Sequence, residues 1–270
     1  MNTSIHPCLD RTIKNILDDD HSTITLVDVM SNDAALKVVN AARISYGNNR
    51  KEYSKKDQRL AKFLWDHEHT SPYRHTYFSF AISAPLFVFR QWVKYQVGST
   101  WRSYEIEGNE VFIEAFDHMF DEDKGCSWNE FSGRYAEFEP HFYVPQRMRA
   151  NAKHGNKQAS SEPEEWSDEF HCEMHMQMHQ DYEYALKRYK YYIDQGIAKE
   201  IARTVLPQNI YTKAYWTVSL QSVLWFLHQR LKPDAQFEIR QYANAIHELL
   251  RGDLERLGIE TQQEIYNGSA

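Results

Sequence analysis

The alternation of apolar and polar residues over Thr76–Ala84 limits the possible folds more than any other feature of this chain. Phe78, Phe80 and Ile82 fall on one face of the stretch, and this period-two pattern predicts a half-buried strand. A strand with one apolar face belongs to a sheet that must bury that face against another layer. The fold therefore needs at least one sheet and elements that cover it.

Further strands and several helices are predicted around this one. Thr23–Met30 and Tyr211–Val218 read as strands, and the residues around Gly108-Asn109 read as a β-hairpin. Caps, prolines and helical spacing predict helices for Asn32 to about Ser45, after Ser54, for Pro85–Gln96, Asp168–Asp194, before Pro207, and for Ser219–Arg230 and Asp234–Gly252. This order is neither all-α nor a regular βαβ alternation, so we predict an α+β fold with a mixed helix and antiparallel-sheet domain.

The predicted domain organisation is simple. We expect a flexible N-terminus over residues 1–22, one domain over residues 23–255 and a C-terminal tail over residues 256–270. A chain of 270 residues is long enough to bury a core without disulfides. Its three cysteines form no CxxC pair, and the polar N-terminus is unlike a signal peptide. These features lead us to expect a cytoplasmic protein.

Charge and hydropathy exclude two classes of partner. The formal net charge of −7 argues against a nucleic acid polymer, because polynucleotide binding needs a basic surface. No apolar run approaches the roughly 18–20 residues that span a bilayer, so no membrane partner is expected. A mononucleotide needs only a few well-placed cations and remains possible.

Common catalytic motifs are absent from the sequence. It contains no GxGxxG, no GxxxxGK[ST] and no GxSxG, which leaves a dinucleotide-binding Rossmann fold, a P-loop and a hydrolase nucleophile elbow unsupported. Cys8 and Cys172 stand in settings that do not suggest a nucleophile. Any chemistry must therefore use hydrogen-bonding and charged side chains, or a bound cofactor.

Functional side chains gather in a few short segments whose composition core packing does not require. Arg134, Arg203 and Arg230 carry planar guanidinium groups that suit a phosphate or an imide edge. Ser132-Gly133 supplies a hydroxyl, and its small residues allow backbone N–H groups to approach an anion. The segments are Ala42–Tyr46, His69–Pro72, Phe89–Gln96, Trp128–Tyr135 and Ile201–Pro207 with Arg230.

Taken together, these segments resemble the flavin-dependent thymidylate synthase family (ThyX), over about Leu26 to Gly252. The clearest matches are Arg90-Gln91-Trp92, Asn129–Tyr135, Val205-Leu206-Pro207, and Tyr211-Thr212 with Trp216-Thr217-Val218. The resemblance implies a homotetramer with active sites between subunits. It also implies FAD as cofactor, with NADPH and 5,10-methylene-tetrahydrofolate as co-substrates, and the reductive methylation of dUMP to dTMP.

The resemblance assigns roles position by position. It implies a catalytic role for Arg230, which stabilises the ionised N3 of uracil. The residues implied to bind dUMP are Gln91, Lys94, Glu130, Ser132, Gly133, Arg134, Arg203 and Arg230. The residues implied to bind FAD or folate are Ser45, His69, Ser71, Lys94, Tyr95, Gln96, Glu130, Ser219, Gln221 and Trp225. No metal ligand is implied.

The chain departs from the family pattern mainly at the flavin. The family's Arg-His-Arg run is replaced by Lys94-Tyr95-Gln96, which loses two guanidinium forks and an imidazole. The Asn and Arg flavin contacts expected near Ser219 and Gln221 are also replaced. Either FAD is held in a modified pocket, which we favour, or the flavin role is weakened.

An insertion is the second departure. Residues 99–127, about 29 residues, intervene where the family pattern runs almost directly into Asn-Glu. This insertion carries the predicted hairpin and an acidic stretch, Asp121-Glu122-Asp123. It is either a surface excursion at a subunit interface, which we favour, or a lid over the site.

Alternative functions remain at this stage. An enzyme of the same ancestry could add another one-carbon group, such as hydroxymethyl, to a pyrimidine nucleotide, or the chain could be a catalytically silent nucleotide-binding homologue. His171, His175 and His179 repeat along one predicted helix, yet three imidazoles in one stripe seldom complete a zinc site. We therefore favour a packed helix there, and Arg43 in turn could simply pair with a carboxylate.

Overall fold

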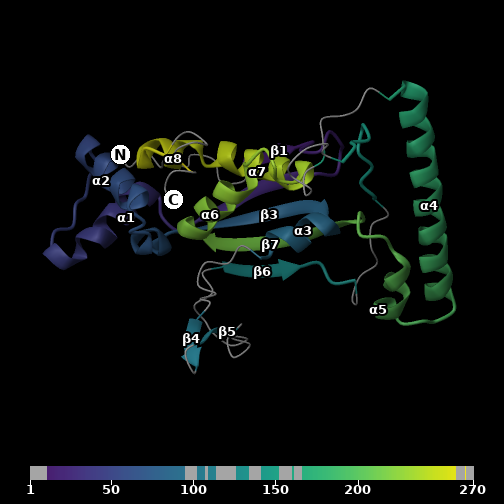
Figure 1. Ribbon diagram of the computed structural model, residues 1–270, viewed down its shortest axis with the longest axis horizontal. Coiled ribbons are helices and arrows are strands. Elements are labelled where there is room, and N and C mark those ends of the chain that lie inside the picture. Colours follow the sequence, from purple (N-terminus) through teal and green to yellow (C-terminus); the bar gives the residue numbers. More distant parts are fainter. Residues whose placement is uncertain are drawn as a thin grey trace.

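The computed structural model describes residues 11–94, 102–106, 109–113, 126–133, 141–151, 160, 166–259 and 265. These residues form an antiparallel five-stranded sheet with helices packed on it and a separate two-stranded hairpin (Figure 1). The large sheet has the order β1-β2-β3-β7-β6, with bounds β1 Arg11–Lys14, β2 Thr23–Val29, β3 Tyr77–Pro85, β6 Cys126–Glu130 and β7 Tyr211–Ser219. The hairpin pairs β4, Arg102–Ile106, with β5, Asn109–Ile113. The predicted α+β class and the predicted hairpin are confirmed.

Strand β3 lies at the centre of the sheet, as its alternating sequence predicts. Phe78, Phe80 and Ile82 are all buried, and they point toward the helical layer. Along its whole length β3 pairs with β7, from Tyr77 opposite Ser219 to Pro85 opposite Tyr211. This register fixes which residues emerge at each end of the sheet, and both functional regions lie at those ends.

The helices follow the sequence predictions closely in most cases. Ser54 forms the expected capping box with Asp57, and Ser219 caps the helix that follows it. The predicted helix over Asp168–Asp194 is observed with those bounds. The α-helices are α1 Ala34–Arg43, α2 Lys55–Asp66, α3 Leu86–Trp92, α4 Asp168–Asp194, α5 Lys199–Ala202, α6 Leu220–Arg230, α7 Phe237–Leu249 and α8 Arg251–Leu257, with 3-10 turns η1 Ile44–Tyr46, η2 Ser71–His75 and η4 Arg203–Val205.

Two helix predictions need correction. The helix predicted over Pro85–Gln96 ends earlier, at Trp92. The predicted helix over Asp234–Gly252 begins later, at Phe237, and is followed by the separate helix α8. Gln236 precedes α7 in an extended conformation, and its side chain contacts Glu238. The polar residues after Pro233 therefore form a turn before the helix begins.

An aromatic cluster joins the helices to the sheet. Trp92 of α3 stacks on Phe226 of α6 with ring centroids 4.9 Å apart, and it meets Trp216 of β7 edge to face at 5.5 Å. Trp128 of β6 stacks on Trp216 at 5.4 Å. Helices α6 and α7 cover one face of the sheet, while the long helix α4 stands at the far edge of the molecule (Figure 1). The cluster holds α3, and hence the residues it carries, firmly against the sheet.

The ordered domain extends beyond the predicted boundaries of 23 and 255. Residues 11–22, expected to be flexible, contain strand β1, and Leu17 and Ser22 are buried. At the other end Leu257 and Ile259, expected in a tail, are buried in the same core. The segment expected as an insertion to residue 127 ends earlier, because Cys126 already pairs with Val218 in the sheet. Edge pairing and a few apolar side chains suffice to order these segments.

Candidate functional site

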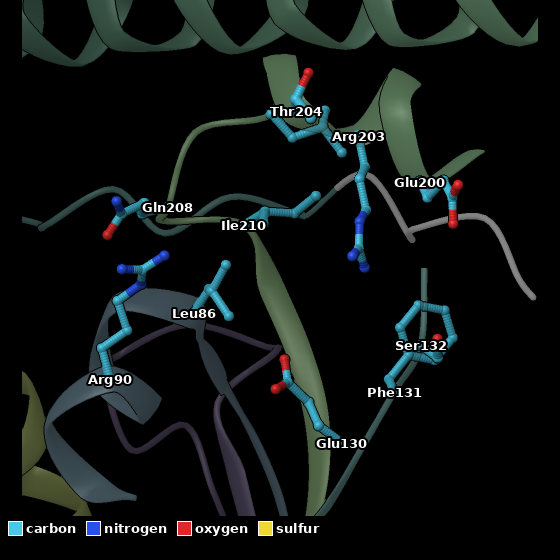
Figure 2. Close-up of a pocket in the computed structure, with 11 residues that line it drawn as sticks. Leu86, Arg90, Glu130, Phe131, Ser132, Glu200, Arg203, Thr204, Gln208 and Ile210 are labelled. Carbon is cyan, nitrogen blue, oxygen red and sulfur yellow. The ribbon is translucent and has the colours of Figure 1, made fainter. Parts of the chain in front are cut away.

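A cavity of ≈ 910 Å³ opens at the end of the sheet where β7 begins. Its volume lies in the range of small-molecule sites, roughly 300–1,000 Å³. Side chains from α3, β6, α5 and the turn before β7 line it (Figure 2). The lining residues are Leu86, Arg90, Glu130, Phe131, Ser132, Glu200, Arg203, Thr204, Leu206, Gln208 and Ile210.

Backbone hydrogen bonds fix the two sides of this cavity relative to each other. At the start of α3, the Leu86 N–H donates to the Ile210 carbonyl and the Phe87 N–H to the Gln208 carbonyl, both at 2.9 Å. On the opposite side the Phe131 N–H donates to the Lys213 carbonyl at 2.8 Å. The cavity is therefore built on the sheet itself and not on a free loop.

Two cations and two carboxylates face the cavity. Arg203 enters from the η4 side and Glu130 from the end of β6, so their charged groups approach from opposite sides (Figure 2). Arg90 projects from α3, and Glu200 lies on the same side of the cavity as Arg203 (Figure 2). Such a set can bind a ligand that carries both an anion and hydrogen-bonding edges.

The Glu130 carboxyl has a perturbed pKa. Surrounding protein removes water from the carboxyl and raises its pKa above the ordinary value. A hydrogen bond from the Thr212 hydroxyl, at 3.4 Å, and the charges of Arg203 and Arg90 oppose this rise. A carboxyl with a raised pKa in a cavity is typical of a functional site.

The predicted nucleotide residues meet only in part. Glu130, Ser132 and Arg203 all line the cavity, and Gly133 follows them as a buried residue. Gln91 does not line it, because its side-chain amide donates to Gln236.

Three further residues predicted for dUMP lie elsewhere or outside the described chain. Lys94 is exposed beyond the end of α3, and Arg230 lies half-buried at the last residue of α6 without lining the cavity. Arg134 lies outside the described residues.

Sequence reasoning missed Arg90 as a lining residue. Phe89 and Trp92 are buried, three positions apart on α3, so they define the inward side of that helix. Neighbouring helical positions point about 100° apart, and Arg90 rather than Gln91 projects into the cavity. At about 100° per residue, Arg90 and Gln91 lie equally far from that inward side, so the spacing of Phe89 and Trp92 does not distinguish them. Glu200 and Gln208 also line the cavity, and no sequence pattern singled them out.

The residues predicted to contact flavin gather at the other end of β7. Ser219 caps α6, accepting a hydrogen bond from the Ser222 N–H at 3.3 Å. The Gln221 side-chain amide donates to the Thr70 hydroxyl at 2.8 Å, next to exposed Ser71. Trp225, one turn further along α6, has 39% of its surface exposed.

Four other residues were predicted to contact flavin or folate, and two of them lie within the described residues. His69 is exposed just before η2, and Ser45 is exposed in η1. Tyr95 and Gln96 lie outside the described residues. No described contact joins Ser45 to the Gln221 region.

The two groups of predicted residues are far apart within one chain. Strand β7 runs from Tyr211, beside the cavity, to Ser219, beside the predicted flavin residues. Eight residue steps of an extended strand span about 27 Å. A ring held at one end therefore cannot stack on a ring held at the other end.

Two other sequence features have structural roles. The Met148 N–H donates to His171 Nδ1 at 3.2 Å, and His175 Nε2 lies 2.8 Å from the Pro145 carbonyl, so these histidines attach α4 to the neighbouring segment. Within the described ranges, no three His, Cys, Asp or Glu side chains gather as metal ligands. Arg43 pairs with buried Asp57, which is the carboxylate contact considered for it.

Among the described residues, no helix is both long and apolar enough to cross a membrane.

The chain matches known proteins over most of its length. The family model described as "Thymidylate synthase complementing protein" matches residues 25–254. The chain is 37% identical over 232 residues to a flavin-dependent thymidylate synthase of Thermus thermophilus, covering 86% of this chain and 72% of that protein. It is 34% identical over 224 residues to one of Thermosipho africanus, covering 83% of each.

A solved structure is similar as well. The UMP/dUMP methylase PolB of Streptomyces cacaoi, bound with 5-Br dUMP, superposes with a TM-score of 0.68. The two sequences are 26% identical, and the match covers 90% of this chain and 94% of that one. Fold and sequence similarity thus extend over nearly the whole molecule.

Proposed function

Because the chain belongs to the flavin-dependent thymidylate synthase family, we propose that it converts dUMP to dTMP by reductive methylation. The observation that carries this proposal is the convergence of Glu130, Ser132 and Arg203 on one cavity. These residues come from separate elements, and the resemblance to the family groups the same three as nucleotide ligands. The related methylase of known structure is described with a brominated dUMP bound.

The cavity's own side chains suit a nucleoside monophosphate. Arg203 and Arg90 bind the phosphate with their planar guanidinium groups. Glu130 and Ser132 accept and donate hydrogen bonds at the opposite side of the cavity. Helix α3 and the turn η4 fix the backbone of the two arginines, so only their side chains need to adjust on binding.

The proposed cofactor is FAD, with NADPH as reductant and 5,10-methylene-tetrahydrofolate as carbon donor. When bound, these groups supply hydride storage and the one-carbon unit, so no protein nucleophile is required. The balanced outcome is that dUMP, the folate, NADPH and a proton give dTMP, tetrahydrofolate and NADP⁺. Half-exposed Trp225 and the polar side chains of Gln221, Ser71 and Thr70 offer the ring surface and donors that such a dinucleotide needs.

Arg230 is the proposed catalytic residue. Its guanidinium stabilises the negative charge on the uracil imide when N3 is ionised, and that charge makes C5 nucleophilic. Because Arg230 does not line the cavity of its own copy, this role requires that it act on uracil bound to another copy.

We further propose that the active site forms between copies of a homotetramer. The supporting observation is that the two groups lie toward opposite ends of β7. Glu130 of the cavity pairs with Ala214, which is five strand steps, or about 17 Å, from Ser219. A flavin held at the Ser219 end of another copy would lie beside a uracil ring in the cavity. The substrates are nucleotides of the cytoplasm, and the reaction is proposed to occur there.

Product identification tests this function. Purified protein is incubated with dUMP, FAD, methylene-tetrahydrofolate and NADPH, and the nucleotide product is identified by mass, with omission of each component as control. The expected product has the mass of dTMP, in which a methyl group replaces one hydrogen of dUMP. A hydroxymethyl nucleotide would identify a different enzyme of the same ancestry. Unchanged dUMP from protein that binds both nucleotide and FAD would refute an enzymatic role.

A further inference from the structure

An arginine that the sequence analysis did not single out lies among the residues predicted to contact flavin. Arg74, in η2, donates from Nε to the Gln221 side-chain oxygen at 2.6 Å. The same Gln221 amide donates to the Thr70 hydroxyl at 2.8 Å. One glutamine therefore ties η2 to the first turn of α6 and fixes the direction of the Arg74 guanidinium.

This hydrogen bond uses only one edge of the guanidinium. Arginine has five N–H donors, and a bond at Nε leaves the two terminal nitrogens available. Arg74 is exposed, and no carboxylate among the described side chains forms an ion pair with it. The side chain is thus a positioned cation whose charge no neighbouring carboxylate neutralises.

The surroundings of Arg74 match the two chemical parts of a nucleotide. Exposed Ser71 offers a hydroxyl within the same turn, η2. Trp225 lies four residues after Gln221, on the same side of α6. Its indole stacks on His228 at 5.2 Å and is still 39% exposed. A phosphate suits the guanidinium, and a flat heterocycle suits the indole.

We propose that Arg74 binds the pyrophosphate of the flavin adenine dinucleotide and that Gln221 is the residue that positions it. The proposal rests on the proposed function, since it assumes FAD as the cofactor. It also accounts for a departure noted in the sequence: near Gln221 the chain lacks an expected arginine. The Arg74–Gln221 hydrogen bond brings a guanidinium to that place from another element.

The test measures FAD binding directly, without turnover. Protein stripped of flavin is titrated with FAD by equilibrium dialysis for the native chain, Arg74→Gln and the double variant Arg74→Gln/Gln221→Arg. Loss of a charge-assisted, bidentate phosphate contact weakens binding on the order of 10- to 100-fold. The double variant carries the guanidinium on the other side of the same contact, so it regains most of the lost affinity.

Two controls separate this role from a structural one. Arg59→Gln removes an exposed arginine from α2 and leaves FAD affinity unchanged. Thermal unfolding of Arg74→Gln without flavin matches the native chain, because an exposed side chain is lost. The affinity of Arg74→Gln also falls less with added salt, since one phosphate contact is gone.

The possible results are distinct. Native FAD affinity in Arg74→Gln, or no recovery in the double variant, overturns the role of Arg74 and leaves the proposed function in place. A native chain that binds no FAD overturns the proposed function and this inference together.

Discussion

Removing the Arg203 guanidinium should weaken dUMP binding much more than deoxyuridine binding. Arg203 enters the cavity from η4, opposite Glu130, and the proposed site pairs it with the phosphate. Arg203→Gln keeps a hydrogen-bonding side chain, although a shorter one, and removes the charge and the guanidinium fork. Deoxyuridine lacks the phosphate, so its weaker binding should be insensitive to the change.

The size of the effect follows from the contacts at stake. A hydrogen bond to a charged group contributes about 1.5–3 kcal/mol, so the dUMP dissociation constant rises roughly 10- to 150-fold. Glu200 lines the same cavity with opposite charge. A cavity of ≈ 910 Å³ is roughly 10 Å across. At that distance the negative charges of the Glu200 carboxylate and the dUMP phosphate repel each other by on the order of 1 kcal/mol, and removing the carboxylate relieves this repulsion. Glu200→Gln should therefore tighten dUMP binding about fivefold.

Isothermal titration of both variants with dUMP and deoxyuridine provides the assay. The two substitutions are matched, since each replaces one charged lining residue with glutamine. Opposite signs for Arg203→Gln and Glu200→Gln, seen with dUMP alone, are the expected result. Equal losses for both variants, or a loss of deoxyuridine binding as large as that of dUMP, would refute the reasoning from charge.

Three further predictions concern stability, pH and assembly. Arg43→Met leaves the fully buried Asp57 carboxylate without its ion pair, which costs roughly 3 kcal/mol of folding stability. Tm should therefore fall by about 6–9 °C in calorimetry. A fall below about 1 °C would show that the ion pair is not needed. Burial lowers the pKa of His228 below 6.5, although its hydrogen bond to the Ile265 carbonyl opposes this shift. The neutral ring therefore contributes to the stability of the fold above pH 6.5, and this contribution is lost on acidification. Trp225 fluorescence, taken as the difference from Trp225→Phe, should accordingly be quenched with a midpoint below 6.5, and a higher midpoint would contradict this. Arg203→Gln and Gln221→Ala can be mixed and assayed with dUMP and FAD too dilute for the respective variant to bind. The mixture should then regain up to roughly a quarter of the native activity if sites are shared between copies, and none if each copy works alone.

The elements that sequence predicted well are those whose own side chains specify them. β3 carries three buried residues in strict alternation, and α4 runs between a capping serine, Ser167, and Gly196, whose φ of 76° ends the helix. The edge strands β1 and β6 were not predicted. They have four and five residues with few apolar side chains, and they become strands only because a neighbouring strand offers hydrogen bonds.

The candidate site was predictable only in part from the sequence. The resemblance to the family implied Glu130, Ser132 and Arg203 as nucleotide ligands, and the structure brings them to one cavity. The resemblance also implied Gln91, but its neighbour Arg90 lines the cavity, because adjacent residues point in different directions on a helix.

The sequence does not predict the distance between the residues assigned to the nucleotide and those assigned to the flavin. It depends on the register of β3 and β7, which places Ser219 and Tyr211 at opposite ends of the sheet. The hydrogen bond between Arg74 and Gln221 joins positions far apart in the chain, and no local pattern indicates it.

Locating bound 5-bromo-dUMP in a crystal of the full chain tests the central claim most directly. The bromine marks C5, the carbon that is proposed to receive the methyl group, and its anomalous signal gives that position independently of any assumed pose. The account predicts one bromine peak per chain, in the cavity lined by Arg203 and Glu130, with the Ser219 end of another copy facing it. A peak outside this cavity, or one that no second copy approaches, would contradict it.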